Sequence, residues 1–321
     1  MTAALPDPAL RRLAGVILVV LAAVGFGSGA FFAGAAFDAG MGSMPVLFWR
    51  FTIAAAVAWA FALGTGAGRR SLRSLGRRRT GTYLLLGTVY VGNGWAFVAA
   101  LSLLPVSLVS MVVYIHPVFV AVLVTLLGRG VGGRSAWVAL AVTMAGIVLS
   151  VGGVPPGVTP DPLGLALAIL CPAIYAVWIV LASILNPAGG VTPRGEAARP
   201  VDASVATAVM MSATASAFAL ILTVGGGTIA PSAVPPDAWW ALIAFGACSG
   251  LAVQAFYAGV RMIGGSRASL ISSVEQVYTI AVAVLLLGEP ISIVQVAGCA
   301  LVVGGVIVAE TGAMRRAAAS G

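Results

Sequence analysis

The feature that most constrains this chain is a series of apolar runs, each close to 20 residues long and separated by short polar gaps. An α-helix of this length spans the hydrocarbon core of a bilayer. Only 8% of the 321 residues are charged and 60% are hydrophobic, which leaves too little polar surface to cover a water-soluble globule. The sequence therefore predicts an all-α integral membrane protein.

We expect ten transmembrane helices, because ten runs approach the length of a membrane span. The first run covers about 25 residues, beyond the roughly 7–15 of a signal-peptide core, so we expect it to remain as an uncleaved span. Five runs fall in a first domain, 13–152, and five in a second, 162–310. The predicted spans are about 13–37, 44–64, 81–104, 106–128, 134–152, 162–186, 202–225, 238–263, 266–287 and 290–310.

The charges between the spans predict the orientation of the chain. Six arginines lie in the gap at 65–80, and the positive-inside rule places this gap in the cytoplasm. With ten spans, both termini and almost all other arginines fall on the same side. All 17 basic residues are Arg, typical of a GC-rich bacterial genome, so we expect a bacterial plasma (inner) membrane with both termini cytoplasmic. The opposite loops carry the acidic residues Asp38, Asp161, Asp237 and Glu289.

The two halves of the chain are similar at a shift of 159 residues, which places Gly87 on Gly246 and Ser110 on Ser269. Because each half contains five spans, the halves cross the membrane in opposite senses. Such inverted repeats are common in secondary transporters, whose substrates bind near the midplane between the repeats. The alternative is chance self-similarity of sequence rich in Ala, Val, Leu and Gly.

Several short motifs are distributed over nearly the whole chain. They are Trp49-Arg50-Phe51, Ser107–Ser110, Pro117-Val118-Phe119, Tyr257–Ile263, Ser266–Glu275 and Leu286–Pro290. Together they resemble the EamA family of the drug/metabolite transporter superfamily. The resemblance implies ten helices in two inverted repeats and a proton- or gradient-coupled carrier of small metabolites such as amino acids. Two positions depart from the family pattern: Gln276 replaces a proline, so whether the helix is kinked near Glu275 is left open, and Arg129 replaces an acidic residue.

Glu275 is the first candidate for a coupling or substrate-binding residue. It lies nine residues into a predicted span, about 13 Å deep at 1.5 Å per residue, close to the bilayer centre. A carboxyl group at this depth normally faces a cavity or a partner, and it could exchange a proton as the protein changes state. The alternative is a protonated glutamate that stabilises helix packing through a hydrogen bond.

His116 is the single histidine, and the 159-residue shift places it opposite Glu275. Pro117 removes the helical hydrogen bond to the carbonyl of Val113. The imidazole is therefore a candidate proton carrier or hydrogen-bond donor, and equally a candidate for satisfying the freed backbone.

Arg50 could recognise a substrate carboxylate through its planar guanidinium, snorkel outward, or pair with a buried acid. We also expect further polar and aromatic residues to line a cavity. These are Asn93, Tyr114, Gln254 and Tyr278, together with Trp95, Tyr175 and Trp178.

The main hypothesis is a secondary transporter that exports a small metabolite across the plasma membrane, coupled to a proton gradient. One alternative is a multidrug or organic-cation exporter like the small four-span relatives. The first helix of those relatives carries a membrane-embedded glutamate, whereas this chain has no acid between Arg12 and Asp38. A non-transporting scaffold is another alternative. The chain has no catalytic motif and no nucleotide-binding loop, so we expect no enzyme activity and no cofactor. Its isolated cysteines predict no metal site. The expected partners are a small-molecule substrate, a proton as coupling ion and membrane lipid, with no nucleic acid; a homodimer is left open.

Overall fold

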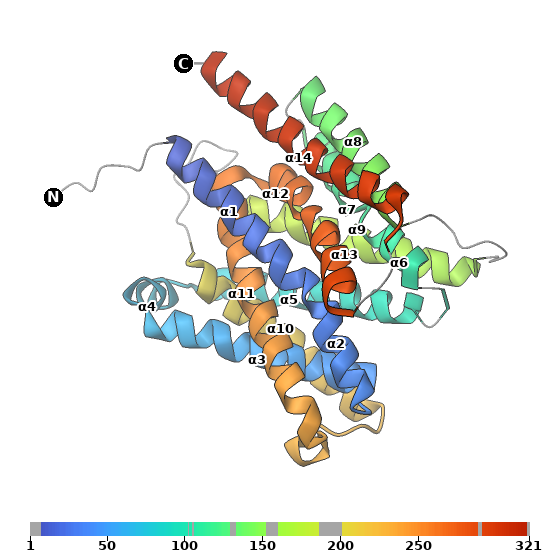
Figure 1. Ribbon diagram of the computed structural model, residues 1–321. Helices are drawn as coiled ribbons and strands as arrows, with labels where there is room; N and C mark the ends of the chain where they lie inside the picture. The colour runs from blue at the N-terminus through green and yellow to red at the C-terminus, as the bar shows by residue number, and fades with distance from the viewer. Residues whose placement is uncertain are drawn as a thin grey trace.

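The computed structural model describes residues 8–101, 103–104, 106–128, 133–151, 160–185, 201–287 and 291–319. The helices run side by side in one bundle, with the two termini near the same end (Figure 1). Throughout the described part of the chain, all regular secondary structure is helical. This agrees with the all-α fold predicted from the apolar runs.

The first half of the chain forms eight helices in the described residues. They are α1 (Pro8–Gly27), α2 (Gly29–Asp38), α3 (Ser43–Gly64), α4 (Gly66–Arg73), α5 (Arg77–Leu101), α6 (Val106–Val113), α7 (His116–Leu126) and α8 (Arg134–Val151). The second half forms α9 (Pro162–Leu185), α10 (Ala203–Val224), the short turns η2 (Pro231–Ala233) and η3 (Pro236–Ala238), α11 (Trp239–Ile263), α12 (Gly265–Ser272), α13 (Val274–Leu287) and α14 (Ile293–Ala319).

Eight helical segments in the described residues are long and apolar enough to cross a membrane, so the protein is a multi-pass membrane protein. Shorter apolar helices stand where the fourth and fifth spans were predicted: α7, which follows α6, and α8. The count of ten spans therefore stays a prediction. The eight segments are 9–38, 43–64, 77–100, 162–185, 203–224, 236–263, 265–285 and 293–312.

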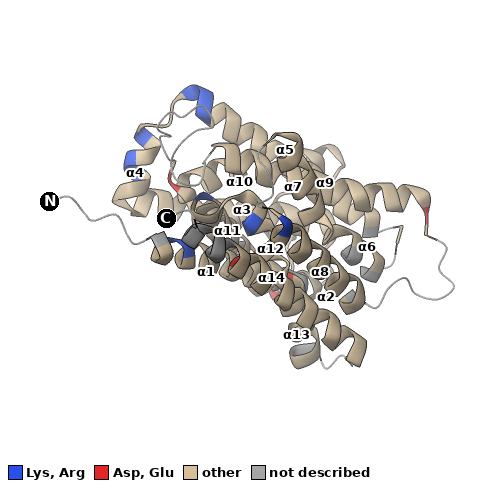
Figure 2. Ribbon diagram, turned by 90° about the horizontal axis from the view of Figure 1, so that it is seen from above, with Lys and Arg blue, Asp and Glu red and all other residues tan. Residues whose placement is uncertain are grey.

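The arginine-containing gap at 65–80 is largely helical, which the hydropathy pattern did not indicate. Thr65 caps α4, because its hydroxyl accepts a hydrogen bond from the backbone N–H of Gly68 at 3.0 Å. The hydroxyl of Ser71 accepts from the N–H of Asp202 at 2.9 Å, which ties α4 to the start of α10. Figure 2 shows basic residues gathered on and beside α4. We call this end of the bundle the arginine-rich face.

Helix breaks occur at equivalent points in the two halves. α6 ends at Val113 and α7 begins at His116, while α12 ends at Ser272 and α13 begins at Val274. In the first half Pro117 removes a backbone donor, which accounts for the break. The second half has Gln276 at the matching position, yet its helix is broken as well. The kink that the sequence left open is therefore present without a proline.

Close helix packing is clearest between α8 and α14, which lie side by side (Figure 1). Gly146 on α8 and Gly298 on α14 face each other, and a Cβ atom built on either would lie 2.7 Å from the carbonyl oxygen of the other. A side chain at either position would force the helices apart. Small residues at such contacts are a common means of helix association in membranes.

Candidate functional site

A cavity of about 450 Å³ lies between the two halves of the chain. Its walls come from α1, α2, α3 and α5, from the end of α6 and its link to α7, and from α9, α11 and α13. The lining is mainly apolar and aromatic, with a few polar groups, as is typical of small-molecule sites. The lining residues are Phe26, Gly27, Gly29, Ala33, Gly34, Phe37, Leu47, Arg50, Phe51, Tyr90, Asn93, Gly94, Phe97, Val113, Tyr114, Cys171, Tyr175, Phe245, Glu275 and Thr279.

The cavity lies in the half of the bundle away from the arginine-rich face. On α5, Asn93 is 16 residues beyond Arg77, about 24 Å along the helix axis at 1.5 Å per residue. On α3, Arg50 lies near the start of the helix, whereas the other end of α3 adjoins α4. The lining residue Phe37 is 45% exposed. The cavity therefore lies nearer the face opposite the arginines.

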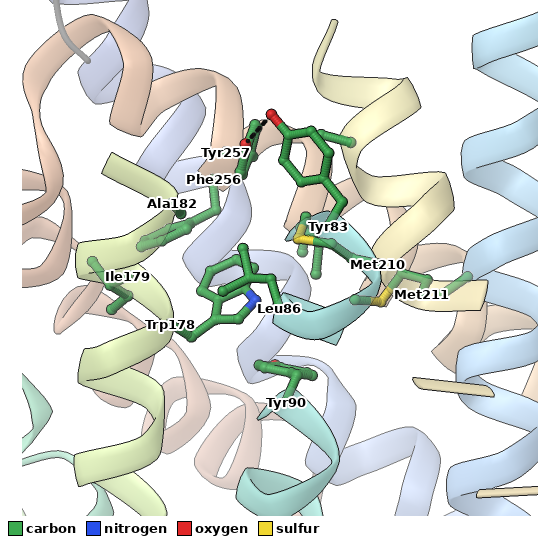
Figure 3. Close-up of a cluster of buried hydrophobic side chains, with 14 of the residues drawn as sticks. Tyr83, Leu86, Tyr90, Trp178, Ile179, Ala182, Met210, Met211, Phe256 and Tyr257 are labelled. Atoms are coloured by element: carbon green, nitrogen blue, oxygen red, sulfur yellow. Dashed lines mark hydrogen bonds between the residues drawn. The ribbon is translucent and has the colours of Figure 1, made fainter. Parts of the chain in front are cut away.

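Buried aromatic side chains pack together between the cavity and the arginine-rich face. Figure 3 shows four of them: Tyr83, Trp178, Phe256 and Tyr257. The ring of Trp178 stacks against Tyr175 and Phe256, with centroids 6.0 Å and 6.1 Å away. Farther toward the arginine-rich face, the hydroxyl of Tyr257 donates to that of Tyr83 at 3.1 Å, and both residues are buried. We call these five residues the aromatic floor.

Arg50 lines the cavity and does not snorkel outward, and in the described part of the chain no acid forms an ion pair with it. Its guanidinium carbon lies 4.3 Å from the centroid of the Phe245 ring and 5.0 Å from that of Phe51. Nε donates to the hydroxyl of Ser249 at 2.9 Å. Among the described residues the one ion pair joins Arg12 and Glu310, far from the cavity. The terminal amino groups of Arg50 therefore remain able to bind an anionic group.

Glu275 lines the cavity from the first turn of α13. The phenol of Tyr114, which comes from the break in the other half, lies within hydrogen-bonding reach of the Glu275 carboxyl and of the Thr279 hydroxyl. Thr279 in turn donates to the backbone carbonyl of Glu275 at 2.9 Å. The acid predicted at the midplane is thus held by groups from both halves. It forms no ion pair with Arg50 among the described residues, although both line the same cavity.

Asn93 is a further polar group in the cavity wall. Its Nδ2 donates to the carbonyl of Cys171 at 3.0 Å and approaches the sulfur of the same residue at 3.1 Å. These contacts fix the orientation of the amide, which leaves its oxygen as an acceptor on the cavity wall.

Three of the predicted site residues do not line the cavity. His116 is buried behind Tyr175, with ring centroids 5.1 Å apart. Gln254 donates to the carbonyl of Gly250 in its own helix at 3.1 Å. The hydroxyl of Tyr278 lies 2.9 Å from that of Ser28. Of the wider set, Tyr175 lines the cavity, Trp178 belongs to the aromatic floor, and Trp95 is 45% exposed.

Three residues with polar groups at the site were not predicted. Tyr90 lines the cavity from α5, and Thr279 and Ser249 are the other two. Thr279 lies four residues after Glu275, so helical spacing places both on one face, and this signal was available in the sequence. Ser249 holds Arg50 from another helix, and nothing in the sequence pairs these two positions. Cys171, one of the isolated cysteines, contributes its carbonyl to the orientation of Asn93.

Comparison with known proteins places the chain in a family. The model of the EamA-like transporter family matches residues 13–152 and again 162–311. The chain belongs to the EamA-like transporter family. This confirms the resemblance drawn from the motifs, and it makes this EamA protein a membrane transporter of small molecules.

The fold of this EamA protein is also found among solved structures. One, described only as "Crystal structure of protein", superposes with a TM-score of 0.76 at 22% identity, covering 94% of this chain and 98% of that chain. At this identity the likeness concerns the fold alone. None of the curated proteins matches the chain.

Proposed function

We propose that this EamA protein is a secondary transporter that exports a small zwitterionic metabolite, such as an amino acid, in exchange for protons. The observation that carries the proposal is the presence of Arg50 and Glu275 in the lining of one aromatic cavity, without an ion pair between them. Two opposite charges left apart in one cavity match a ligand that carries both charges itself.

The cavity suits an amino acid in its charges and in its size. The guanidinium of Arg50 can bind a carboxylate with two parallel hydrogen bonds. The carboxylate of Glu275 and the amide oxygen of Asn93 can accept hydrogen bonds from an ammonium group. The remaining wall is largely aromatic, so it favours an apolar side group. A volume of about 450 Å³ falls within the usual range for small-molecule sites.

Exchange follows if the proton and the ammonium group compete for Glu275. A protonated carboxyl group does not attract an ammonium group, and a carboxylate engaged by substrate is less readily protonated. The positive-inside rule places the arginine-rich face in the cytoplasm, so the described cavity opens to the outside. In this state the substrate leaves and Glu275 takes up a proton. In the opposite state the proton is released and a new substrate binds.

An organic-cation exporter is the second candidate, because an acid in an aromatic cavity also suits a cation. Arg50 argues against it. Its guanidinium lies in the same cavity, without an ion-pair partner among the described residues, and repels a ligand of like charge.

Flux in proteoliposomes tests the proposal. Purified protein is assayed with amino acids, purines and organic cations, with and without an imposed pH gradient. We expect gradient-dependent movement of one or more amino acids. Preferential transport of a cation would support the second candidate instead, and no amino-acid flux in folded protein would overturn the proposal.

A further inference from the structure

His116 lies in the partition between the cavity and the arginine-rich face. On one side its ring packs against Tyr175, which lines the cavity. On the other side the next residue, Pro117, lines a separate small cleft of about 30 Å³ together with Ser266 and Arg267. The single imidazole of the chain is therefore buried between two openings that do not meet.

Hydrogen-bond acceptors surround the imidazole. Nε2 lies 3.3 Å from the hydroxyl of Ser272. That hydroxyl donates its one proton to the carbonyl of Ser269 at 2.8 Å, so it accepts from His116. The ring also interacts with the backbone carbonyls of Val113 and Ser269. A neutral imidazole has one N–H, whereas a protonated imidazole has two, so these surroundings can hold an additional proton.

Buried polar side chains continue from the imidazole toward Glu275. The Oγ atoms of Ser269 and Ser273 and the Oε1 atom of Gln276 are buried without a hydrogen-bond partner among the described residues. The amide of Gln276 donates to Ser150 at 2.8 Å. Buried groups of this kind normally find a partner, often water. With Ser266 at the cleft, they recur every three or four residues along the chain, from the cleft to Gln276, the neighbour of Glu275.

We propose that His116 and the serines of α12 form a proton route between Glu275 and the cleft at the arginine-rich face. This inference rests on the proton coupling in the proposed function. Water entering from the cleft bridges the polar groups. Glu275 loses one proton and becomes a carboxylate, each intermediate group accepts one proton and donates one, and the cytoplasm gains one proton. Glu275 uses this route in the opposite state, in which the proposed exchange releases its proton.

The groups that face His116 are compatible with this role. Tyr175 is the titratable group nearest the ring on α9, which carries no charged residue. On α12 the one charged residue is Arg267, which lines the cleft. Glu275 follows at the start of α13. A proton on His116 thus has an acid on the cavity side and open water on the cleft side.

The competing explanation is that His116 only satisfies the backbone freed by Pro117. Two variants separate the explanations. His116→Gln keeps a hydrogen-bond donor but cannot relay a proton, and Ser272→Ala keeps the imidazole but removes its side-chain partner. Ser183→Ala on α9 is the matched control, because the described hydrogen bond of this hydroxyl is to Val180 in its own helix.

The experiment measures two rates in proteoliposomes with leucine as the probe. Leucine counterflow at equal pH reports binding and alternation, and a pH-sensitive dye in the lumen reports proton movement driven by a leucine gradient. We expect proton movement to fall about tenfold or more in both variants. Counterflow should stay within about twofold of wild type, since neither residue contacts the substrate. The control should change neither rate.

Each outcome decides one claim. Equal losses of counterflow and proton movement would support the backbone explanation and overturn the route. Wild-type proton movement in either variant would overturn it too. If the wild-type protein moves leucine without protons, the coupling itself fails, and the route fails with it. If wild-type protein in a folded state moves no leucine, the leucine-driven route is refuted, while the remaining amino acids of the flux panel still test the proposed substrate class.

Discussion

Replacing Glu275 with glutamine should abolish accumulation against a gradient while leaving the carrier intact. Among the described residues, Glu275 is the one carboxyl group that lines the cavity, which predicts one proton per substrate. One proton crossing a pH difference of one unit releases about 1.4 kcal/mol, enough for a concentration ratio of about ten. We therefore expect a ratio near ten in wild-type protein and near one in Glu275→Gln.

The assay uses proteoliposomes with the membrane potential clamped and a pH step of one unit, and it measures the steady-state ratio of labelled substrate. Counterflow at equal pH should persist in the variant, because the carboxamide keeps a hydrogen-bonding group near Tyr114 and an acceptor for an ammonium group. Glu310→Gln is the matched control, since Glu310 pairs with Arg12 at 2.7 Å and lies outside the cavity lining. Its accumulation ratio should match wild type.

Two results would refute this reasoning. An unchanged ratio in Glu275→Gln would show that another group carries the proton. A wild-type ratio near one hundred at the same pH step would require two protons per substrate, and the cavity as described offers one carboxyl group for that task.

Three further changes test the rest of the site. Arg50→Gln should raise the apparent KM for an amino acid about 30-fold or more, since removing a buried charge partner typically costs about 2–5 kcal/mol of binding free energy. Arg50→Lys should restore little of the affinity because a lysine lacks the planar guanidinium. A full rescue by lysine would show that charge alone suffices. Tyr83→Phe should remove the hydrogen bond to Tyr257 and shift the conformational equilibrium about 2- to 10-fold toward opening at the arginine-rich face, which is the usual effect of losing a neutral hydrogen bond. Cysteine labelling from that face measures the shift, with Thr88→Val as an exposed control. Unchanged labelling would refute a gating role. Cysteines introduced near Gly157 and Arg194, both outside the described residues, should label from opposite sides of the membrane, and labelling from the same side would refute the ten-span topology.

The positions of eight of the predicted spans agree closely with long apolar helices of the structure, because the length of an apolar run is set by the thickness of the bilayer. α4 was missed since it is short and rich in arginine, so a search for apolar runs passes over it. The break near Glu275 was left open because the sequence offers no proline there. At this turn the backbone hydrogen bonds span three residues instead of the four of an α-helix. The N–H of Ser273 donates to the carbonyl of Leu270, and the N–H of Gln276 donates to that of Ser273, both at 3.2 Å.

The candidate site was harder to predict, because helices that are apolar on every side give little indication of which face turns inward. Of the candidates named from the sequence, Arg50, Asn93, Tyr114 and Glu275 line the cavity. Gln254 is equally polar but folds back on its own helix. Which polar residues converge is decided by helix rotation in the packed bundle, and a single sequence carries little information about that rotation.

The equivalent breaks in the two halves present different residues for different tasks. In the second half the break sets Glu275 at the start of α13, where it lines the cavity. In the first half the break sets His116 at the start of α7, where it is buried beside Ser272. If the halves were identical, both positions would carry the same group, and a proton would have no reason to favour either one. Glu275 lines the cavity, where substrate can reach it, whereas the imidazole of His116 is buried behind the cavity wall. This difference would let Glu275 bind substrate while His116 passes protons.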